Sequence, residues 1–279
     1  DDTEEWRKFW PANVHIIGKD IVRFHTVYWP AFLMSAGLPL PKQVFGHGFL
    51  LSRGEKMSKS LGNVVDPMQL AELFGVDALR YFLLREVSFG QDGSYSPEAI
   101  VTRVNADLAN SFGNLAQRTL SLIFKNCEGY LPAIRGHNDD DTALLDLVGA
   151  TVSQHIPGHY EDLAMSQGLE SWMQAVFACN AYVDVQAPWA LKKTDPKRME
   201  TVLATLFICI AQLAIAALPI IPGSATKLLD QMGVPLDVRN FHAAGSHWYS
   251  PLAESNYQIA QPVGLFPRLE MPAEEGTAT

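Results

Sequence analysis

The chain has 279 residues, enough for two domains of roughly 150 residues each, and its 48% hydrophobic and 18% charged residues are typical of a globular protein. This composition excludes disordered and collagen-like classes. Thirty Asp and Glu against 21 Lys and Arg give a net charge of −9, the wrong sign for a protein that coats nucleic acid nonspecifically. Any contact with RNA or phosphate therefore has to be local.

The three cysteines are too far apart for a CxxC pair or a metal-ligand spacing, so we expect inert thiols in a reducing cytosol. The first six residues are acidic and polar, without the features of a secretory signal. The apolar run 202–218 is interrupted by Thr205 and Gln212 and is short for a bilayer span, which favours a buried core helix. The sequence predicts a cytoplasmic protein with no membrane partner.

The first third of the chain alternates strand and helix signals. Residues 13–18 form a short apolar run that ends at Gly18, and residues 21–32 carry apolar side chains at helical spacing. Further strands are predicted over 43–48 and 49–51. A strand, helix and parallel strand place ligands at the carboxyl ends of the strands. Roughly 95 residues are too few for a doubly wound sheet, so we expect the chain to begin inside a domain.

From residue 96 onward the pattern is helical. A Ser cap and Pro97 open a long amphipathic helix, whose polar side forms one stripe from Asp107 to Lys125. The acidic run 138–141 is expected to be a loop and helix cap, with a metal site as the alternative. Helices are also predicted over 142–156, 160–186 and 196–218. The predicted fold class is thus α/β over residues 1–95, followed by an all-α bundle over 96–279.

Residues 54–63 form the most informative segment. Two lysines, Lys56 and Lys59, lie three residues apart in a glycine-bounded loop that also carries Ser58 and Ser60. Ammonium groups, hydroxyls and loop amides suit a polyphosphate. A short Lys/Ser run is commonly a solvated surface loop, but the complete pentapeptide Lys-Met-Ser-Lys-Ser is far more restrictive than a charge count.

That pentapeptide resembles the second signature of the class I aminoacyl-tRNA synthetases, and the order and spacing of other segments are similar to the methionyl-tRNA synthetase family. These segments are His15–Ile21, Phe24–His25, Trp29–Ala31, Gly46–Gly48, Asp77–Tyr81, Asn105–Leu108, Asn114–Arg118 and Gln186–Trp189. The family's first signature and its inserted domain, which can hold zinc, are missing. The resemblance therefore implies the C-terminal half of such an enzyme: the C-terminal part of a Rossmann-type catalytic domain, a helical anticodon-binding domain and a C-terminal tail.

The resemblance implies that the enzyme activates methionine with ATP to methionyl-adenylate and transfers it to tRNA(Met) in protein biosynthesis. Lys56 and Lys59 would be the catalytic residues, stabilising charge on the departing phosphates beside Mg²⁺. Ser58 would bind ATP with them. The N-terminal half of the same enzyme would be the partner, and the assembled enzyme would be monomeric. No zinc ligand or other metal ligand is expected in this chain.

The resemblance also implies the small-molecule sites. Gly18 and Asp20 would contact the adenosine and His47 the adenine, while a helix cap at Asp20 and a tight turn around His47 are the alternatives. Ile21 and His25 lie four residues apart, on one helical face. They would line the methionine pocket, with His25 near the sulfur. A packed core histidine is the alternative.

The helical half would hold the anticodon through Asn114, Arg118, Pro188 and Trp189. An Asn can read a base edge, an Arg can pair with phosphate or base, and a Trp can stack beneath an unpaired base. Taken singly, each is better explained structurally: Asn114 as an exposed helix residue, Arg118 as part of a surface ion pair and Trp189 as a half-buried tryptophan. For the whole chain the alternatives are another class I synthetase and a non-catalytic RNA-binding module.

Overall fold

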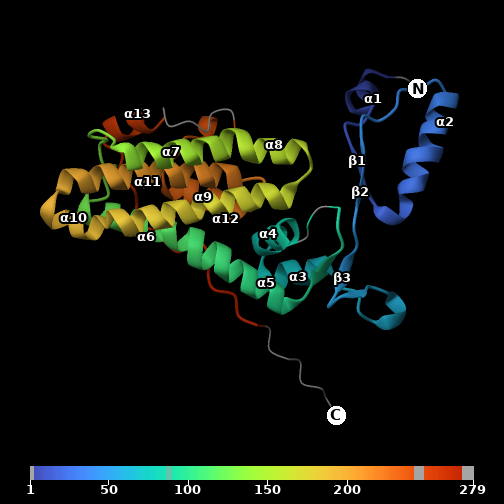
Figure 1. The fold of residues 1–279 in the computed structure, drawn as a ribbon, viewed down its shortest axis with the longest axis horizontal. Coiled ribbons are helices and arrows are strands. Elements are labelled where there is room, and N and C mark those ends of the chain that lie inside the picture. Colours follow the sequence, from blue (N-terminus) through green and yellow to red (C-terminus); the bar gives the residue numbers. More distant parts are fainter. Residues whose placement is uncertain (1–2, 87, 89, 242–247, 272–279) are drawn as a thin grey trace, which may run out of the picture. The chain divides into compact units, whose positions relative to one another are not determined.

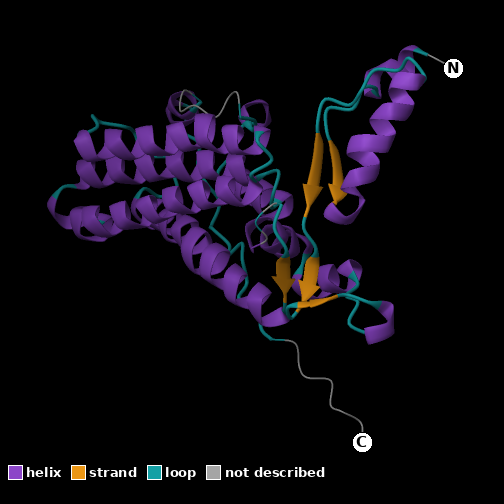
Figure 2. Cartoon of the chain, turned by 45° about the vertical axis from the view of Figure 1, so that its right-hand side comes forward, coloured by secondary structure: helices purple, strands orange, loops and turns teal. Residues whose placement is uncertain are grey.

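The computed structural model describes residues 3–86, 88, 90–241 and 248–271, and its contacts divide the chain into two compact units. Unit 1 comprises Asp1–Val65 and Glu86–Ser96, and unit 2 comprises Asp66–Arg85 and Pro97–Thr279. Helices dominate the described residues, with strands confined to small sheets (Figure 2). The segment 66–85 thus packs with the helical unit, whereas the division into domains at residue 95 stays a prediction.

Unit 1 begins with helix α1 (Glu4–Phe9) and contains two parallel strands. Strand β1 (His15–Gly18) pairs with β2 (Val44–His47) in a register that sets Ile16 opposite Phe45. Between them the chain forms a 3-10 turn η1 (Lys19–Ile21), a π-helical stretch η2 (Phe24–Tyr28) and helix α2 (Trp29–Ser35). The predicted strand, helix and parallel strand are therefore present.

Prolines account for two of the π-helical stretches. Pro30 lies at the start of α2, where its ring would collide with the carbonyl of Thr26 in a regular helix. Widening the preceding turn to the π form removes that collision. Pro157 bears the same relation to Ser153 in η5 (Thr151–His155). A third stretch, η4 (Asn105–Gly113), has no proline, and its Ser111 hydroxyl donates to the carbonyl of Ala106 at 2.9 Å.

The second sheet of unit 1 has three strands. Strand β3 (Leu50–Ser52) pairs antiparallel with β4 (Glu55–Lys56) and parallel with β5 (Gly93–Tyr95). The turn between β3 and β4 consists of Arg53 and Gly54, with φ of 49° and 86°, the left-handed pair that a two-residue hairpin requires. This hairpin leads directly into the lysine-containing segment.

Unit 2 is helical apart from loops and one isolated bridge among its described residues. Its elements are α3 (Pro67–Phe74), α4 (Val76–Glu86), α5 (Pro97–Val104), η4, α6 (Asn114–Asn126), α7 (Asp139–Ala150), η5, α8 (Ile156–Glu161), α9 (Met165–Gln186), α10 (Pro188–Thr194), α11 (Pro196–Ala217), α12 (Pro222–Gln231), η6 (Leu236–Val238) and α13 (Tyr249–Glu254). The long helix predicted from residue 96 is confirmed as α5, η4 and α6 in direct succession. The other predicted helices are present, whereas α3, α4, α10, α12 and α13 were not predicted.

Helix α11 forms the centre of unit 2, beside α7 and α9 (Figure 1). It is long and apolar enough to cross a bilayer, yet nearly all of its residues are buried against the other helices. Both polar interruptions, Thr205 and Gln212, are buried as well. Among the described residues, the apolar run thus behaves as the predicted core helix.

A buried carboxylate ties these three helices together. Asp141 of α7, with no exposed surface, accepts hydrogen bonds from both terminal nitrogens of Arg198 in α11 and from the Tyr182 hydroxyl in α9. It also closes a capping box with Asn138, as the acidic run 138–141 predicted for a helix cap. Arg198 Nη2 donates in addition to Gln186 at 2.7 Å, at the end of α9.

Candidate functional site

The lysine segment forms a braced loop after the β3–β4 hairpin. The Ser58 hydroxyl caps a short 3-10 turn, η3 (Lys59–Leu61), by accepting from Ser60 N at 3.2 Å. Asn63 braces the loop from its far end: its Oδ1 accepts from Ser58 N at 2.8 Å and its Nδ2 donates to the Lys56 carbonyl at 3.2 Å. The fixed turn presents both Lys56 and Lys59 to solvent.

The two lysines differ in their surroundings. Lys56 Nζ lies 4.7 Å from the centroid of the Phe49 ring. Within the described part of the chain, no carboxylate pairs with Lys59. The loop therefore keeps one ammonium group beside an aromatic ring and leaves another free for an incoming anion, which suits electrostatic stabilisation of phosphate.

The end of β1 places Gly18 and Asp20 in contact. A Cβ on Gly18 would lie 2.7 Å from Asp20 Oδ1, so the carboxylate occupies space that only glycine leaves open. Asp20 lies inside η1, whose N-cap is Gly18, so a helix cap does not explain it. Its predicted contact with ribose stays a prediction.

Close backbone packing surrounds His47. A Cβ on Gly48 would lie 2.0 Å from the carbonyl oxygen of Gln91, and one on Gly46 would lie 2.7 Å from Val22. His47 Nδ1 donates to the Gly48 carbonyl at 2.8 Å. Close backbone approach thus explains the two glycines, and a contact of His47 with adenine stays a prediction.

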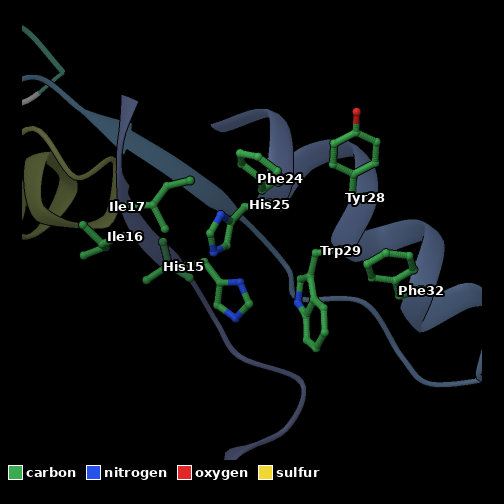
Figure 3. A pocket seen from close by; sticks show the side chains of 9 residues that line it. His15, Ile16, Ile17, Phe24, His25, Tyr28, Trp29 and Phe32 are labelled. Atoms are coloured by element: carbon green, nitrogen blue, oxygen red, sulfur yellow. The ribbon is translucent and has the colours of Figure 1, made fainter. Parts of the chain in front are cut away.

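A cavity of about 680 Å³ lies between β1 and the helical segment that follows it (Figure 3). Its lining residues are Val14, His15, Ile16, Ile17, Phe24, His25, Tyr28, Trp29 and Phe32. The imidazole rings of His15 and His25 form an edge-to-face pair, with centroids 6.3 Å apart. Most of the remaining lining is aromatic or aliphatic, so the cavity suits an apolar side chain with a polar end.

The tautomer of His25 follows from its partner. His25 Nδ1 lies 3.0 Å from the Ile21 carbonyl oxygen, and because a carbonyl only accepts, Nδ1 carries the proton. In the neutral ring the other nitrogen, Nε2, is then an acceptor. His25 therefore lines the cavity rather than packing in a core. Ile21 is not among the lining side chains, and its predicted contact with methionine stays a prediction.

Sequence reasoning missed most of this cavity. His15, Phe24, Tyr28, Trp29 and Phe32 were not predicted as site residues, although all five line it. A signal was present, because four aromatic residues gather on one short predicted helix, at positions 24, 28, 29 and 32. The π-helical stretch η2, which only the structure reveals, is a further indication of a site, since such bulges frequently occur at functional sites.

The third group lies in unit 2, on α6 and α10. The Arg118 guanidinium lies 5.6 Å from the Trp189 ring centroid and donates to Asp184 Oδ1 at 3.1 Å. Trp189 is 48% exposed, so it is not a core residue, and Asn114 is exposed one helical turn before Arg118. The structure thus brings Arg118 and Trp189, which are far apart in the sequence, close together.

A left-handed residue fixes the position of Trp189. Ala187, with φ of 42° and ψ of 60°, is both the last cap of α9 and the first cap of α10. Pro188 follows it, buried at the start of α10. A single residue therefore joins α9 to α10, and no loop separates Trp189 from the end of α9.

Two family models cover the chain. One, described as tRNA synthetases class I (M), matches residues 1–120, and the other, the anticodon binding domain of methionyl tRNA ligase, matches residues 131–270. The chain belongs to the methionyl-tRNA synthetase family. The chain thus matches a class I synthetase catalytic region followed by an anticodon-binding domain, as the resemblance implied.

Curated relatives within the methionyl-tRNA synthetase family agree. The methionine–tRNA ligase of Rhizobium meliloti is 53% identical over 98% of this chain and 52% of its own length. That of Mycobacterium bovis is 50% identical over 97% of this chain and 52% of its own. The chain therefore spans about half the length of the relatives it matches.

Solved structures of the methionyl-tRNA synthetase family superpose closely on this chain. The Mycobacterium tuberculosis methionyl-tRNA synthetase in complex with methionyl-adenylate has a TM-score of 0.88 and 48% identity, over 96% of this chain and 52% of that one. The free form of that enzyme also has a TM-score of 0.88, with 45% identity, over 97% and 52%. In the described part of this chain, no group of three His, Cys, Asp or Glu side chains could hold a metal ion.

Proposed function

We propose that this chain takes part in the ATP-dependent activation of methionine and its transfer to tRNA(Met), the reaction of a methionine–tRNA ligase. The observation that carries the proposal is the complete, solvent-exposed lysine loop in a chain 53% identical to a methionine–tRNA ligase. A relative bound to methionyl-adenylate supports the same reaction. The location proposed with this function is the cytoplasm, as expected from the sequence.

Lys56 and Lys59 would stabilise the charge that builds on the triphosphate as the methionine carboxylate attacks the α-phosphorus and pyrophosphate leaves. This role needs position and charge, and it needs no nucleophilic side chain. Mg²⁺ would enter with ATP and neutralise part of the phosphate charge, since the described residues offer no cluster of carboxylates for it. Ser58 and Asn63 would hold the loop in shape.

Methionine would occupy the cavity beside β1. Its thioether is soft and polarizable and packs well against ring edges such as those of Phe24, Tyr28 and Trp29. Nε2 of His25, unprotonated in the neutral ring, would accept a hydrogen bond within the cavity. A thioether sulfur cannot donate, so this tautomer would pair His25 with the ammonium group of methionine rather than with the sulfur that the resemblance implied.

In finer detail, we propose that unit 1 is part of a Rossmann-type catalytic domain and that the helices of unit 2 form a bundle. Among the described residues of unit 1, the buried apolar side chains are Ile17, Leu33 and Tyr95, whereas several large ones are more than half exposed. These exposed residues are Phe9, Ile16, Phe24, Val27, Phe32, Met34, Leu61 and Val64. So many exposed large apolar side chains are typical of a surface that contacts another part of a protein. The part of the relatives that this chain does not match would cover it and complete the active site.

Methionine-dependent pyrophosphate exchange tests the proposal. The 279-residue chain alone is expected to catalyse no measurable exchange, because part of the active site lies outside it. Co-expression with the complementary half of a relative is expected to restore exchange. Robust exchange by the chain alone would contradict the proposed division of the site, and no exchange by the assembled enzyme would contradict the proposed reaction.

The group on α6 and α10 would bind the anticodon of tRNA(Met). Trp189 would stack on an unpaired base, Arg118 would contact a base or phosphate, and Asn114 would read a base edge. Pro188, which is buried at the start of α10, would hold the backbone of the adjacent Trp189 in place. A half-exposed indole beside a guanidinium forms the platform on which single-stranded bases stack.

Trp189→Ala in the assembled enzyme is expected to weaken aminoacylation of tRNA by about 1–3 kcal/mol while leaving pyrophosphate exchange nearly unchanged. The ring is 48% exposed, so its loss opens no cavity in the core. Tyr130→Ala, which removes a similarly exposed ring elsewhere in unit 2, is the matched control and should leave both reactions unchanged. Parallel loss of both reactions, together with a lower melting temperature, would contradict the anticodon assignment.

A non-catalytic RNA-binding module is not favoured, because the lysine loop is complete and a cavity lined by His25 is present. Another class I synthetase is not favoured either, since the methionyl anticodon-binding model matches half of the chain.

A further inference from the structure

A third lysine of unit 1 is held in a fixed position close to the lysine loop. Lys19 follows β1, and its Nζ lies 2.6 Å and 2.8 Å from the two carboxylate oxygens of Asp92. The same Nζ lies 4.8 Å from the centroid of the Phe49 ring. An exposed lysine normally samples many rotamers, so these three contacts restrict it unusually well.

Phe49 joins this lysine to the lysine loop. Its ring carries Lys19 Nζ at 4.8 Å and Lys56 Nζ at 4.7 Å, so two ammonium groups meet at one aromatic side chain. Its backbone N–H donates to Asp92 Oδ1 at 2.8 Å, which ties the carboxylate to the residue that carries the ring, directly before β3. Asp92 therefore fixes both the lysine and the ring between the two lysines.

The charges of this cluster favour an anion. Two ammonium groups against one carboxylate leave a net positive charge, and Lys59 of the same loop adds to it without a carboxylate partner in the described residues. Hydrogen bonds from Lys19 and from the backbone of Phe49 lower the pKa of Asp92, so its carboxyl stays ionised at neutral pH and keeps Lys19 in place. Without that carboxylate, repulsion between the ammonium groups would drive Lys19 into solvent.

We propose that Lys19 is a further phosphate-binding residue, which contacts the triphosphate of ATP together with Lys56, and that Asp92 is the residue that positions it. This inference rests on the proposed function, because it assigns a second source of cationic contact to the same reaction. Both Lys19 and Asp92 are more than one-third exposed. An exposed ion pair contributes little to stability, so its main effect here is to place the ammonium group.

Lys19→Met tests the assignment, because it keeps a long apolar side chain over Phe49 and removes the charge. In the assembled enzyme, the KM for ATP in pyrophosphate exchange is expected to rise about tenfold, the effect of one lost charge-assisted hydrogen bond. The KM for methionine and the melting temperature should not change. Lys19→Arg should recover most of the ATP affinity. Asp92→Asn, which can still accept from Phe49 N–H, should give a smaller rise in the KM for ATP.

Arg135→Met is the matched control, since Arg135 forms an exposed ion pair with Glu200 at 3.0 Å in unit 2. It should leave both KM values unchanged. An unchanged KM for ATP in Lys19→Met, or equal rises in both KM values with a lower melting temperature, would overturn the inference while leaving the proposed function intact.

Calorimetric titration of the 279-residue chain with inorganic tripolyphosphate separates the inference from the reaction itself. All four residues of the cluster lie in unit 1 of this chain, so the wild-type chain should bind tripolyphosphate and Lys19→Met should bind it about tenfold more weakly. Equal binding by the two chains would overturn the role of Lys19 even if exchange by the assembled enzyme were absent.

Discussion

Replacing Arg198 by methionine is expected to lower the free energy of unfolding by about 3–5 kcal/mol, the largest effect anticipated for any single change considered. The substitution leaves the carboxylate of Asp141 fully buried without its cationic partner. Tyr182 still donates to that carboxylate, but a hydroxyl cannot neutralise it. Urea denaturation of the chain, followed by far-UV circular dichroism, measures the change.

Two variants test whether the cost comes from the unpaired charge. Adding Asp141→Leu to Arg198→Met removes the orphaned carboxylate and is expected to recover part of the loss. Arg135→Met breaks an exposed ion pair and should change the free energy of unfolding by less than about 1 kcal/mol. A loss for Arg198→Met no larger than that of Arg135→Met would show that the buried pair does not stabilise the helices.

Acid provides a second measurement of the same pair. Burial acts to raise the pKa of Asp141, but hydrogen bonds from Arg198, Tyr182 and the Asn138 backbone outweigh burial and hold it below the usual carboxyl value. The contribution to stability is therefore present above the unfolded-state pKa and is lost as the pH falls through the folded-state pKa. The wild-type chain should lose stability in that acidic range more steeply than Arg198→Met.

Lys59→Ala in the assembled enzyme is expected to reduce the rate of adenylate formation about a hundredfold, or about 3 kcal/mol. The ammonium group acts mainly where charge develops in the transition state, so the KM for methionine should change much less. Single-turnover formation of methionyl-adenylate measures the rate directly. It separates chemistry from product release.

Lys42→Ala is the control for Lys59→Ala, because Lys42 is an exposed lysine of unit 1 outside the loop. Its adenylation rate should equal that of the wild type. A Lys59→Ala rate close to that of Lys42→Ala would make the lysine loop an ordinary solvated segment.

The features that sequence predicted best are contiguous in the chain. The lysine loop is one pentapeptide, and the helices of unit 2 follow from apolar periodicity over ten or more residues. Helix α11 was predicted as a core helix because its apolar run is interrupted by Thr205 and Gln212 and is short for a bilayer span. Short elements were harder, since the three residues of β5 have no alternating pattern and become a strand through pairing with β3.

Contacts between distant residues were not predictable from the sequence. Asp92 approaches Lys19 across 73 residues, and Arg118 approaches Asp184 across 66. Neither pair has a local signature, because each depends on how strands or helices are brought together. The same holds for His15 on β1 and His25 in η2, whose rings form an edge-to-face pair. The resemblance to a family indicated several site residues, but it did not indicate the distant residues that contact them.

The exposed apolar side chains of unit 1 have a practical consequence for any preparation of the chain by itself. Exposed Phe9, Phe32 and Met34 give one copy a surface on which another copy can adhere. The net charge of −9 keeps copies apart through long-range repulsion. Added salt shortens the range of that repulsion, and sulfate or phosphate also strengthens the association of apolar surfaces. Concentrated ammonium sulfate is therefore a poor choice for purification, whereas a dilute, low-salt buffer preserves the single copies that the complementary half has to meet.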